Sequence, residues 1–319
     1  FGSSRFRLSI FNFPDFKLNS SSTMAQLKSE QQTKDKWNVA LCSFLHVFVY
    51  IASYFYYGSH PTVELQTNPN LPPLKIFNIP GMVVVSGTLT LVLIPLVVEF
   101  FEYKRTNPNL WGNVAANQWN SLTCIPTEMI CFPWMLTRMD PIGSSWGRIL
   151  VDTVIYLMMA DFWFYWTHRL FHQVPCLWQF HVLHHNLNPA KGVSAIAAAS
   201  TSAIDFTITH LPMIWWPFLV RTFCVEAIGF SLIFMITWLT FIHSYSFWSY
   251  DSVVMMDPTN HRVHHCWGRK NNYNFAAFTT IYDRAFGTYR SEKEMKKAWQ
   301  RGEKEEVAVA LDGWGTKKE

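Results

Sequence analysis

HRLFHQVPCLWQFHVLHH, residues 168–185, and HRVHH, residues 261–265, hold eight of the twelve histidines in a chain of 319 residues. The eight fall into three clusters with spacings of three or four residues, which place side chains on one face of a helix. Imidazole is the commonest neutral protein ligand for transition metals. One HxxxH can arise by chance, but two HxxHH clusters after it predict a shared metal site. The predicted ligands, also the predicted catalytic residues, are His168, His172, His181, His184, His185, His261, His264 and His265.

The number of histidines predicts more than one metal ion. A tetrahedral zinc site takes four ligands, and a catalytic zinc site takes three plus water. Eight or nine imidazoles therefore fit two metals with four or five ligands each. Imidazole suits iron, zinc and copper alike, so the ligands do not name the metal. Zinc binds more tightly than ferrous iron in general, so recombinant protein is expected to be able to carry zinc.

The composition is that of a membrane protein. Charged residues make up 15% of the chain and aromatic residues 17%, whereas soluble domains carry about 25% charged residues. The net charge of +4 is not gathered into a basic stripe, so we predict no nucleic-acid partner. The six cysteines are scattered without a CxxC pair, which predicts free thiols and neither a disulfide framework nor a zinc ribbon.

Apolar segments alternate with charged or proline-rich segments along the chain. Those that approach the length needed to cross a hydrocarbon core of about 30 Å are 37–57, 79–98, 119–136 and 149–166. Segments 206–220 and 227–242 are shorter and predict a re-entrant hairpin or an embedded helix pair. We therefore predict an all-α fold, an integral membrane helical bundle with a cytosolic cap that holds the histidine-rich metal site.

The predicted organisation has four parts. Residues 1–36 are rich in Ser, Gln and Lys and are expected to be disordered. Residues 37–148 supply transmembrane helices, and residues 149–290 form the catalytic domain that holds all the clustered histidines. Residues 291–319 form a charged C-terminal tail.

The basic residues predict the orientation in the membrane. Lys28, Lys34 and Lys36 precede the first apolar segment, and Lys104 and Arg105 follow the second. Loops rich in Lys and Arg stay on the cytosolic side. Four crossings and a hairpin that enters and leaves by one face then give a multi-pass protein. Its N-terminus, metal site and C-terminal tail are predicted to face the cytosol.

Between about residues 152 and 289 the sequence resembles the fatty acid hydroxylase / sterol desaturase superfamily of membrane non-haem di-iron oxidases. The stretches that carry the resemblance are DFWFYWTHRLFH (161–172), LWQFHVLHHNLNP (177–189), FIHSYSF (241–247), NHRVHH (260–265) and NNYNFAAFTTIYDRAFGTY (271–289). The family pattern HxxxH, HxxHH, HxxHH is met at all eight positions. Tyr282 stands where the family carries a tryptophan.

The resemblance implies a lipid hydroxylase or desaturase of the endoplasmic reticulum membrane that uses dioxygen and two iron ions. Its electrons would come from cytochrome b5 or a reductase, and its substrate would be a sterol, a fatty acyl chain or a sphingoid base. His243 is implied as an additional ligand, because sterol oxidases of the family carry a histidine in a similar motif. One departure is the segment 202–205, SAID, which keeps an acidic residue but lacks the His-Pro pair common in sterol-active members.

Other polar residues near the clusters are predicted to support the ligands. A ligating imidazole usually donates its second N–H to a carboxylate or carbonyl. The candidate partners are Asp161, two helical turns before His168, and Asp205, Asp283 and Asn186. His210 lies in an apolar stretch and is predicted to be a core residue, and neither His46 nor His60 is predicted to bind metal.

Three other functions fit the sequence less well. A haem electron carrier would need isolated histidine pairs across the bilayer, which HxxHH clusters on one face disfavour. A divalent-metal transporter would need polar residues inside its spans, yet the first two apolar segments carry no charge. A membrane zinc hydrolase would need HExxH, which none of the three clusters matches.

Overall fold

The computed structural model is built almost entirely of helices. It describes residues 21–59, 63–65, 74–76, 89–101, 109–140, 142–187, 194–244, 252–265, 273–291, 293–294 and 297. The predicted all-α class is confirmed, since the described strands are short: β1 (Val63–Leu65) pairs antiparallel with β2 (Leu74–Ile76), and β3 (Met139–Asp140) pairs parallel with β4 (Phe223–Cys224).

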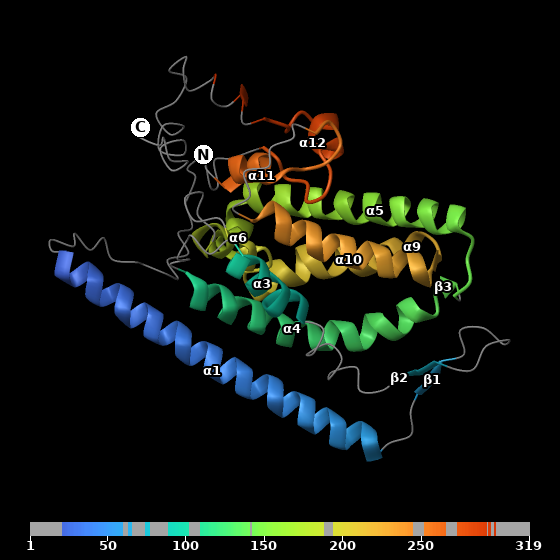
Figure 1. The fold of residues 1–319 in the computed structure, drawn as a ribbon, viewed down its shortest axis with the longest axis horizontal. Helices are drawn as coiled ribbons and strands as arrows, with labels where there is room; N and C mark the ends of the chain where they lie inside the picture. Colours follow the sequence, from blue (N-terminus) through green and yellow to red (C-terminus); the bar gives the residue numbers. More distant parts are fainter. Residues whose placement is uncertain are drawn as a thin grey trace, which may run out of the picture.

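Three long helices form the body of the molecule (Figure 1). They are α4 (Leu110–Leu136), α5 (Trp146–Gln173) and α10 (Val225–Ile242). α5 packs against α10, and the long helix α1 (Ser21–Ser59) packs along α4. Tyr156, Phe218 and Phe223 meet edge to face at the centre of the largest apolar cluster, which ties α5 to the chain entering α10.

Shorter elements connect and cover the long helices. Their bounds are η1 (Leu89–Leu93), α3 (Ile94–Phe101), α6 (Pro175–Leu187), η3 (Ala195–Ala197), α7 (Ala203–Asp205), η4 (Phe206–His210), α8 (Leu211–Trp215), α9 (Pro217–Val220), α11 (Pro258–His265) and α12 (Ile281–Ala285). α11 and α12 lie against the same side of α5 (Figure 1). Residues 206–220, predicted as one arm of a hairpin, form the broken series η4, α8 and α9.

A sharp corner joins α5 to α6 and brings the first two histidine clusters together. Val174 ends α5 in an extended conformation, with φ −92° and ψ 115°. A residue that precedes proline is pushed out of the helical region, and Pro175 then occupies the first turn of α6, where its missing N–H costs nothing. The helices contact each other after this turn, so His168 and His172 face the histidines of α6.

The opposite end of the bundle is locked by charges. Asp152, which is fully buried, accepts hydrogen bonds from Arg148 and Arg221, each at 2.7 Å, and from the N–H of Cys224 at 3.1 Å. These contacts hold the start of α5 against the β3–β4 pair. The histidine end and the ionic end therefore lie about a helix length apart.

Two helices are long and apolar enough to cross a membrane, α5 and α10, among the residues the structure describes. The segment 227–242, predicted as half of an embedded pair, is therefore also a candidate span. α1 adds an exposed apolar stripe at spacings of three and four residues, with Trp37, Phe44 and Phe55 between 66% and 72% exposed. Such a stripe on a soluble monomer would be unusual. The four-span count stays a prediction.

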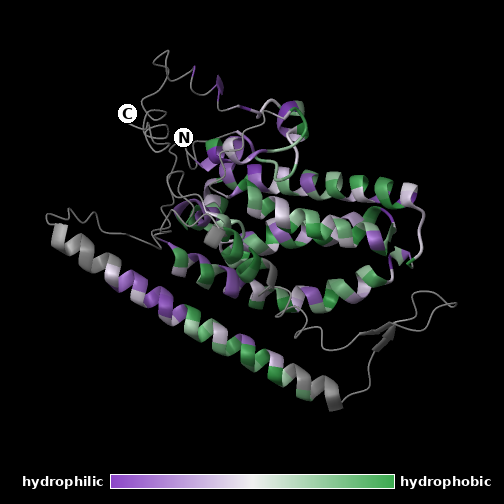
Figure 2. Cartoon of the chain, in the orientation of Figure 1, coloured by the Kyte–Doolittle hydropathy of each residue, from purple (hydrophilic) through white to green (hydrophobic). Residues whose placement is uncertain are grey.

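α1 also corrects the predicted N-terminal boundary. Figure 2 shows hydrophilic residues on the earlier part of this helix and hydrophobic residues on the later part. The helix begins at Ser21, well ahead of residue 37, so part of the segment expected to be disordered is helical. Residues 1–20, much of segment 79–98 and most of the tail after residue 291 lie outside the described residues.

Candidate metal centre

Nine histidines gather into two neighbouring groups, each able to hold a metal ion, among the residues the structure describes. The first group is His168, His172, His181, His185 and His264, and the second is His184, His243, His261 and His265. Within each group the ligand nitrogens all lie within 4.8 Å of one another. Every one of the nine side chains is at most 7% exposed. The eight clustered histidines and His243 are thus brought together as the sequence predicted.

The HxxHH clusters are each divided between the two groups. α6 sends His181 and His185 to the first group and His184 to the second. α11 sends His264 to the first and His261 and His265 to the second. Because an HxxHH cluster has one member off the face shared by the other two, it can serve two adjacent sites.

The Nδ1 atoms of five rings face oxygen atoms. The pairs are His168 with the Phe275 carbonyl (2.8 Å), His184 with Ser200 (3.3 Å), His243 with Leu239 (2.8 Å), His264 with Tyr273 (2.9 Å) and His181 with the Asp205 carboxylate (2.7 Å). A carbonyl oxygen or a carboxylate accepts, so each of these Nδ1 atoms donates. The Nε2 atom of each ring then keeps its lone pair for a metal.

The first pair of rings shows that the centre fits transition metals. Nε2 of His168 lies 3.1 Å from Nε2 of His181. Both rings already donate through Nδ1, so two lone pairs face each other without a proton between them, which is repulsive unless a cation separates them. Two imidazoles bound at about 2.1 Å and at right angles place their nitrogens about 3.0 Å apart. The Nε2 atoms of His243 and His261, at 2.9 Å, have a similar spacing.

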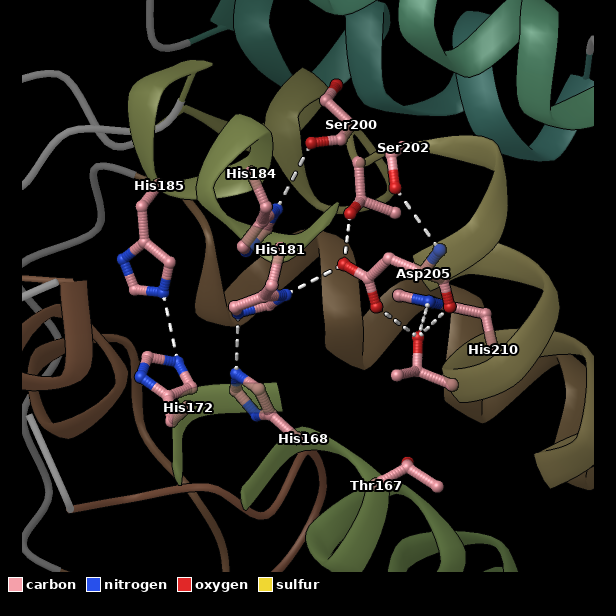
Figure 3. Close-up of polar contacts among 12 residues, drawn as sticks. Thr167, His168, His172, His181, His184, His185, Ser200, Ser202, Asp205 and His210 are labelled. Carbon is pink, nitrogen blue, oxygen red and sulfur yellow. Dashed lines mark hydrogen bonds and ion pairs between the residues drawn. The ribbon is translucent and has the colours of Figure 1, made fainter. Parts of the chain in front are cut away.

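Asp205 is the carboxylate partner that the sequence predicted (Figure 3). Besides His181 it accepts hydrogen bonds from the hydroxyls of Thr201 and Thr209. Burial acts to raise the pKa of Asp205, but the interaction with His181 outweighs it and lowers the pKa overall. Ser202 caps the short helix α7 by accepting the backbone N–H of Asp205 at 3.2 Å.

Two asparagines of α4 position the chain segment that carries these partners, and the sequence reasoning missed them. Nδ2 of Asn120 donates to the carbonyls of Ala199 and Thr201, and Nδ2 of Asn117 donates to the carbonyl of Ile196. The Ser200 hydroxyl donates to Oδ1 of Asn117 at 2.9 Å. Asn117 and Asn120 lie three residues apart at the start of an otherwise apolar segment. This pair of amides was the sequence signal that could have identified them.

The third cluster sits on a short, firmly capped helix. Asp257 precedes Pro258, and its Oδ1 accepts the N–H of Asn260 at 2.6 Å. An acidic N-cap followed by proline at the first helical position is a favoured way to begin a helix. The first turn of α11 is thus fixed, which orients His261, His264 and His265 towards α5 and α6.

Asp161 and Asp283 support the metal centre indirectly, through a loop that contacts it. Asp161 accepts the N–H groups of Ala277, Phe278 and Thr279 at 2.8–3.0 Å. Asp283 accepts the N–H of Phe275 at 2.9 Å, and burial raises its pKa to about 7. Both carboxylates therefore hold the loop whose Phe275 carbonyl orients His168, and neither bonds a histidine in the described part of the chain.

Asn274 shapes the same loop. It is the described non-glycine residue with a positive φ, +57°, a conformation that asparagine tolerates better than most residues. Its side-chain amide donates to the carbonyls of Asn260 and Arg290, both at 2.8 Å. The loop is thereby tied both to α11 and to the start of the tail.

Three predicted positions lie outside the two groups. His210 is buried, stacks on Phe206 and bonds the Thr209 hydroxyl through Nδ1 at 2.6 Å, as expected for a core residue. His46 lies on α1, where Nδ1 meets the Cys42 carbonyl at 2.7 Å. The side chain of Asn186 is exposed, and its backbone carbonyl instead accepts from Asn109. His60 lies outside the described residues.

Burial favours the neutral form of at least five of the nine imidazoles. It lowers the pKa of His264 to about 3 and that of His243 to about 4, and it lowers the pKa of His184, His185 and His261 well below the usual value. Neighbouring imidazoles add to the effect in the last three. A neutral imidazole is the form that binds metal, so the fold prepares the ligands.

An apolar cavity of about 400 Å³ adjoins the centre between α4 and α10. Ala199, Leu239 and Thr240 line the end next to the histidines, and Met139 and Ile228 line the far end. On α10 the lining extends from Ile228 to Thr240, about 18 Å at 1.5 Å per residue. A volume in this range suits a small-molecule ligand.

The chain is similar to proteins of one family. The family model for fatty acid hydroxylase matches residues 153–288. The chain is 30% identical to the fatty acid hydroxylase vlmA of Lecanicillium sp. over 45% of its own length and 43% of the relative. It is 31% identical to alkylglycerol monooxygenase of Xenopus tropicalis, over 42% of its own length and 30% of the relative. It is 28% identical to the Delta(7)-sterol 5(6)-desaturase of Candida dubliniensis, over 58% of its own length and 50% of the relative.

These matches span half or less of each relative just named. No solved structure gave a significant match. The matched region contains every clustered histidine, His243, and the loop that holds His168. Residues 153–288 therefore match a fatty acid hydroxylase domain, and this part of the chain is similar to fatty acid hydroxylases and sterol desaturases.

Proposed function

We propose that this protein is a membrane-bound oxidoreductase that hydroxylates or desaturates a lipid with dioxygen, using two iron ions held by the nine histidines. The observation that carries the proposal is the pair of adjoining five- and four-histidine groups beside a long apolar cavity. The relatives named above, a fatty acid hydroxylase, an alkylglycerol monooxygenase and a sterol desaturase, support it.

Iron bound by these imidazoles would supply the activation of dioxygen needed to break an unactivated C–H bond. In hydroxylation, one oxygen atom enters the substrate and the other leaves as water, with two electrons and two protons supplied from outside. In desaturation, the substrate loses two hydrogens and both oxygen atoms leave as water, again with two electrons and two protons. Both outcomes begin at one C–H bond, so the histidine arrangement supports either.

The chain's own residues would bind, orient and exclude water. The apolar walls of the cavity would take the hydrocarbon body of the lipid and shut water out of the centre. The Asp205–His181 pair and the carbonyls facing Nδ1 would keep the imidazoles in the tautomer that presents Nε2. We propose a sterol, a fatty acyl chain or a sphingoid base as the substrate.

Electrons would come from a separate protein. The chain holds no GxGxxG stretch for a dinucleotide, so cytochrome b5 or a reductase is the proposed donor. The proposed location is the endoplasmic reticulum membrane, with the centre facing the cytosol, where such a donor could reach it.

Metal analysis and lipid profiling together test the proposal. Protein purified from the membranes of host cells grown with added iron should hold two metal ions per chain. Zinc is expected to replace iron in some recombinant preparations. Expression in a yeast strain that lacks its own sterol desaturase should produce an oxidised lipid.

The variants His264→Ala and His46→Ala provide a matched pair, since both remove a buried imidazole. Only His264→Ala should lower the metal content and abolish turnover. One metal or none per wild-type chain, or full turnover by His264→Ala, would contradict the proposal.

A further inference from the structure

A carboxylate stands in the wall of an otherwise apolar cavity. Of the described residues that line it, Glu128 of α4 alone carries a formal charge. Its neighbours along the wall include Phe132, Met135 and Leu232. Burying a charge among apolar groups is costly unless a partner compensates it. Packing alone therefore does not explain why a carboxylate lies in this wall.

Its carboxylate has no hydrogen-bond or ion-pair partner among the described contacts, whereas other buried carboxylates are satisfied. Asp152 has two arginines, and Asp161 and Asp283 have backbone N–H groups. Glu128 is half-buried, so it retains some access to the cavity space. A carboxylate that faces a cavity and lacks a donor from the protein is suited to a donor on a ligand.

The position of Glu128 separates it from the metal centre. Ser121 lines the cavity one residue after Asn120, which holds the Ala199 and Thr201 carbonyls beside the histidines. Glu128 follows Ser121 by seven residues, about 10 Å along the helix. A bound lipid could therefore place one carbon at the centre while its polar group reaches Glu128.

We propose that Glu128 is a specificity-determining residue that receives a hydrogen bond from the polar group of the lipid substrate, a hydroxyl or an ammonium group. The oxygen atoms of a carboxylate accept hydrogen bonds, so Glu128 favours lipids with a donor over esters and ethers. The inference rests on the proposed function only in taking the cavity as the substrate site.

Binding of three matched probes to the metal-loaded, full-length protein in lipid nanodiscs tests this inference. The probes are hexadecan-1-ol, its methyl ether, which lacks the donor, and hexadecan-1-amine. A hydrogen bond to a charged group should make the alcohol bind about tenfold more tightly than the ether. Equal affinities of wild-type protein for the alcohol and the ether would overturn the proposal.

Two substitutions assign the effect to Glu128. Glu128→Leu removes the acceptor and should abolish the advantage of the alcohol without changing the affinity for the ether. Glu128→Gln keeps a neutral acceptor, so a hydroxyl-binding site should retain part of the advantage. A site for an ammonium group should instead bind the amine most tightly in wild type and lose that preference in Glu128→Gln. An advantage of the alcohol that persists in Glu128→Leu would refute the assignment.

Controls separate this result from folding and from the metal chemistry. Glu294→Gln removes an exposed carboxylate outside the cavity and should leave all three affinities unchanged. If Glu128→Leu does not fold, the affinities of wild-type protein for the alcohol and the ether still test whether the cavity favours a hydrogen-bond donor. Binding requires no turnover, so a preference for the alcohol in protein with fewer than two metals would support Glu128 while the metal proposal failed.

Discussion

Asp205 links the metal centre to the chain segment behind it through a single buried carboxylate. It accepts from His181 and from the hydroxyls of Thr201 and Thr209, while Ser202 caps its short helix. An asparagine at this position would present an NH₂ group or a neutral oxygen to Nδ1 of His181. The ring would then be held less firmly in the tautomer that presents Nε2.

Asp205→Asn is therefore expected to weaken metal retention or activity by about 10- to 100-fold. Metal content after dialysis against a weak chelator measures the effect. Ser202→Ala removes the helix cap at a cost of about 1 kcal/mol and should retain both metals. If Asp205→Asn held metal as firmly as Ser202→Ala does, Asp205 would have no part in orienting the ligand.

His243 and His210 differ in a way that mutation can separate. His243 belongs to the four-histidine group, and its Nε2 lies 2.9 Å from Nε2 of His261. His210 is also buried but stacks on Phe206 outside both groups. We predict that His243→Ala loses metal from the second group and most activity, whereas His210→Ala keeps two metals per chain. Metal counting on both variants checks this, and the reverse order would show that the ninth ligand is misassigned.

The sequence predicted those site residues whose side chains are chemically distinctive. The spacing of the clusters predicted the eight histidines, and the surviving acid in segment 202–205 predicted Asp205. The partners of His168 and His264 could not be predicted, because they are the backbone carbonyls of Phe275 and Tyr273, which any residue supplies. Asp161 was predicted at the right place but with another role, since sequence spacing does not show that a distant loop closes over it.

The contact of α5 with the loop after residue 273 supports the ligand ring of His168. Asp161 of α5 accepts three backbone N–H groups of this loop and the hydroxyl of Thr279. Each buried N–H left without a partner costs about 1–3 kcal/mol. The loop and the helix are therefore strongly coupled.

Asp161→Ala should destabilise the fold by about 3 kcal/mol or more, while Thr279→Val, which loses only the hydroxyl bond, should cost about 1 kcal/mol. Thermal unfolding in detergent ranks the two variants. A smaller shift for Asp161→Ala than for Thr279→Val would mean that the loop is held elsewhere.

Helix boundaries were harder to predict than the helices themselves. The apolar segments predicted α4, α5 and α10. The helix α1 begins before its apolar part because charged residues such as Lys34 and Lys36 also favour a helix. Segment 206–220 looked continuous, yet Pro212 and Pro217 divide it into short turns. Tertiary packing decides such details.

For the whole molecule, the burial of so many imidazoles predicts acid sensitivity in the absence of metal. A histidine whose pKa is lower in the folded chain binds fewer protons when folded, so acid favours the unfolded state. The loss begins as pH falls through the unfolded value of about 6.5 and continues towards the folded values, about 4 for His243 and about 3 for His264.

The melting temperature of metal-free protein should therefore fall between pH 7 and pH 4. Metal-loaded protein should resist this fall until protons displace the metal. A melting temperature of the metal-free form that stayed constant over this range would contradict the neutral, buried state of the imidazoles.

The orientation in the membrane gives another prediction for the whole chain. The predicted spans place the N-terminus, the histidine clusters and the tail on the cytosolic side. Protease added to sealed microsomes should then remove a tag near Met24 and a tag after Glu319. Tags on opposite faces would mean an odd number of spans.

The burial of all nine imidazoles also affects how the protein matures in a cell. None of the nine side chains is more than 7% exposed, and they come from α5, α6, α11 and the residue that follows α10. An ion can reach them only before these helices close, or when they part again. The rate at which the helices part would then set how fast metal enters or leaves folded protein. Cells short of metal would accumulate folded, metal-free molecules, and metal added afterwards would load them only as fast as these helices open.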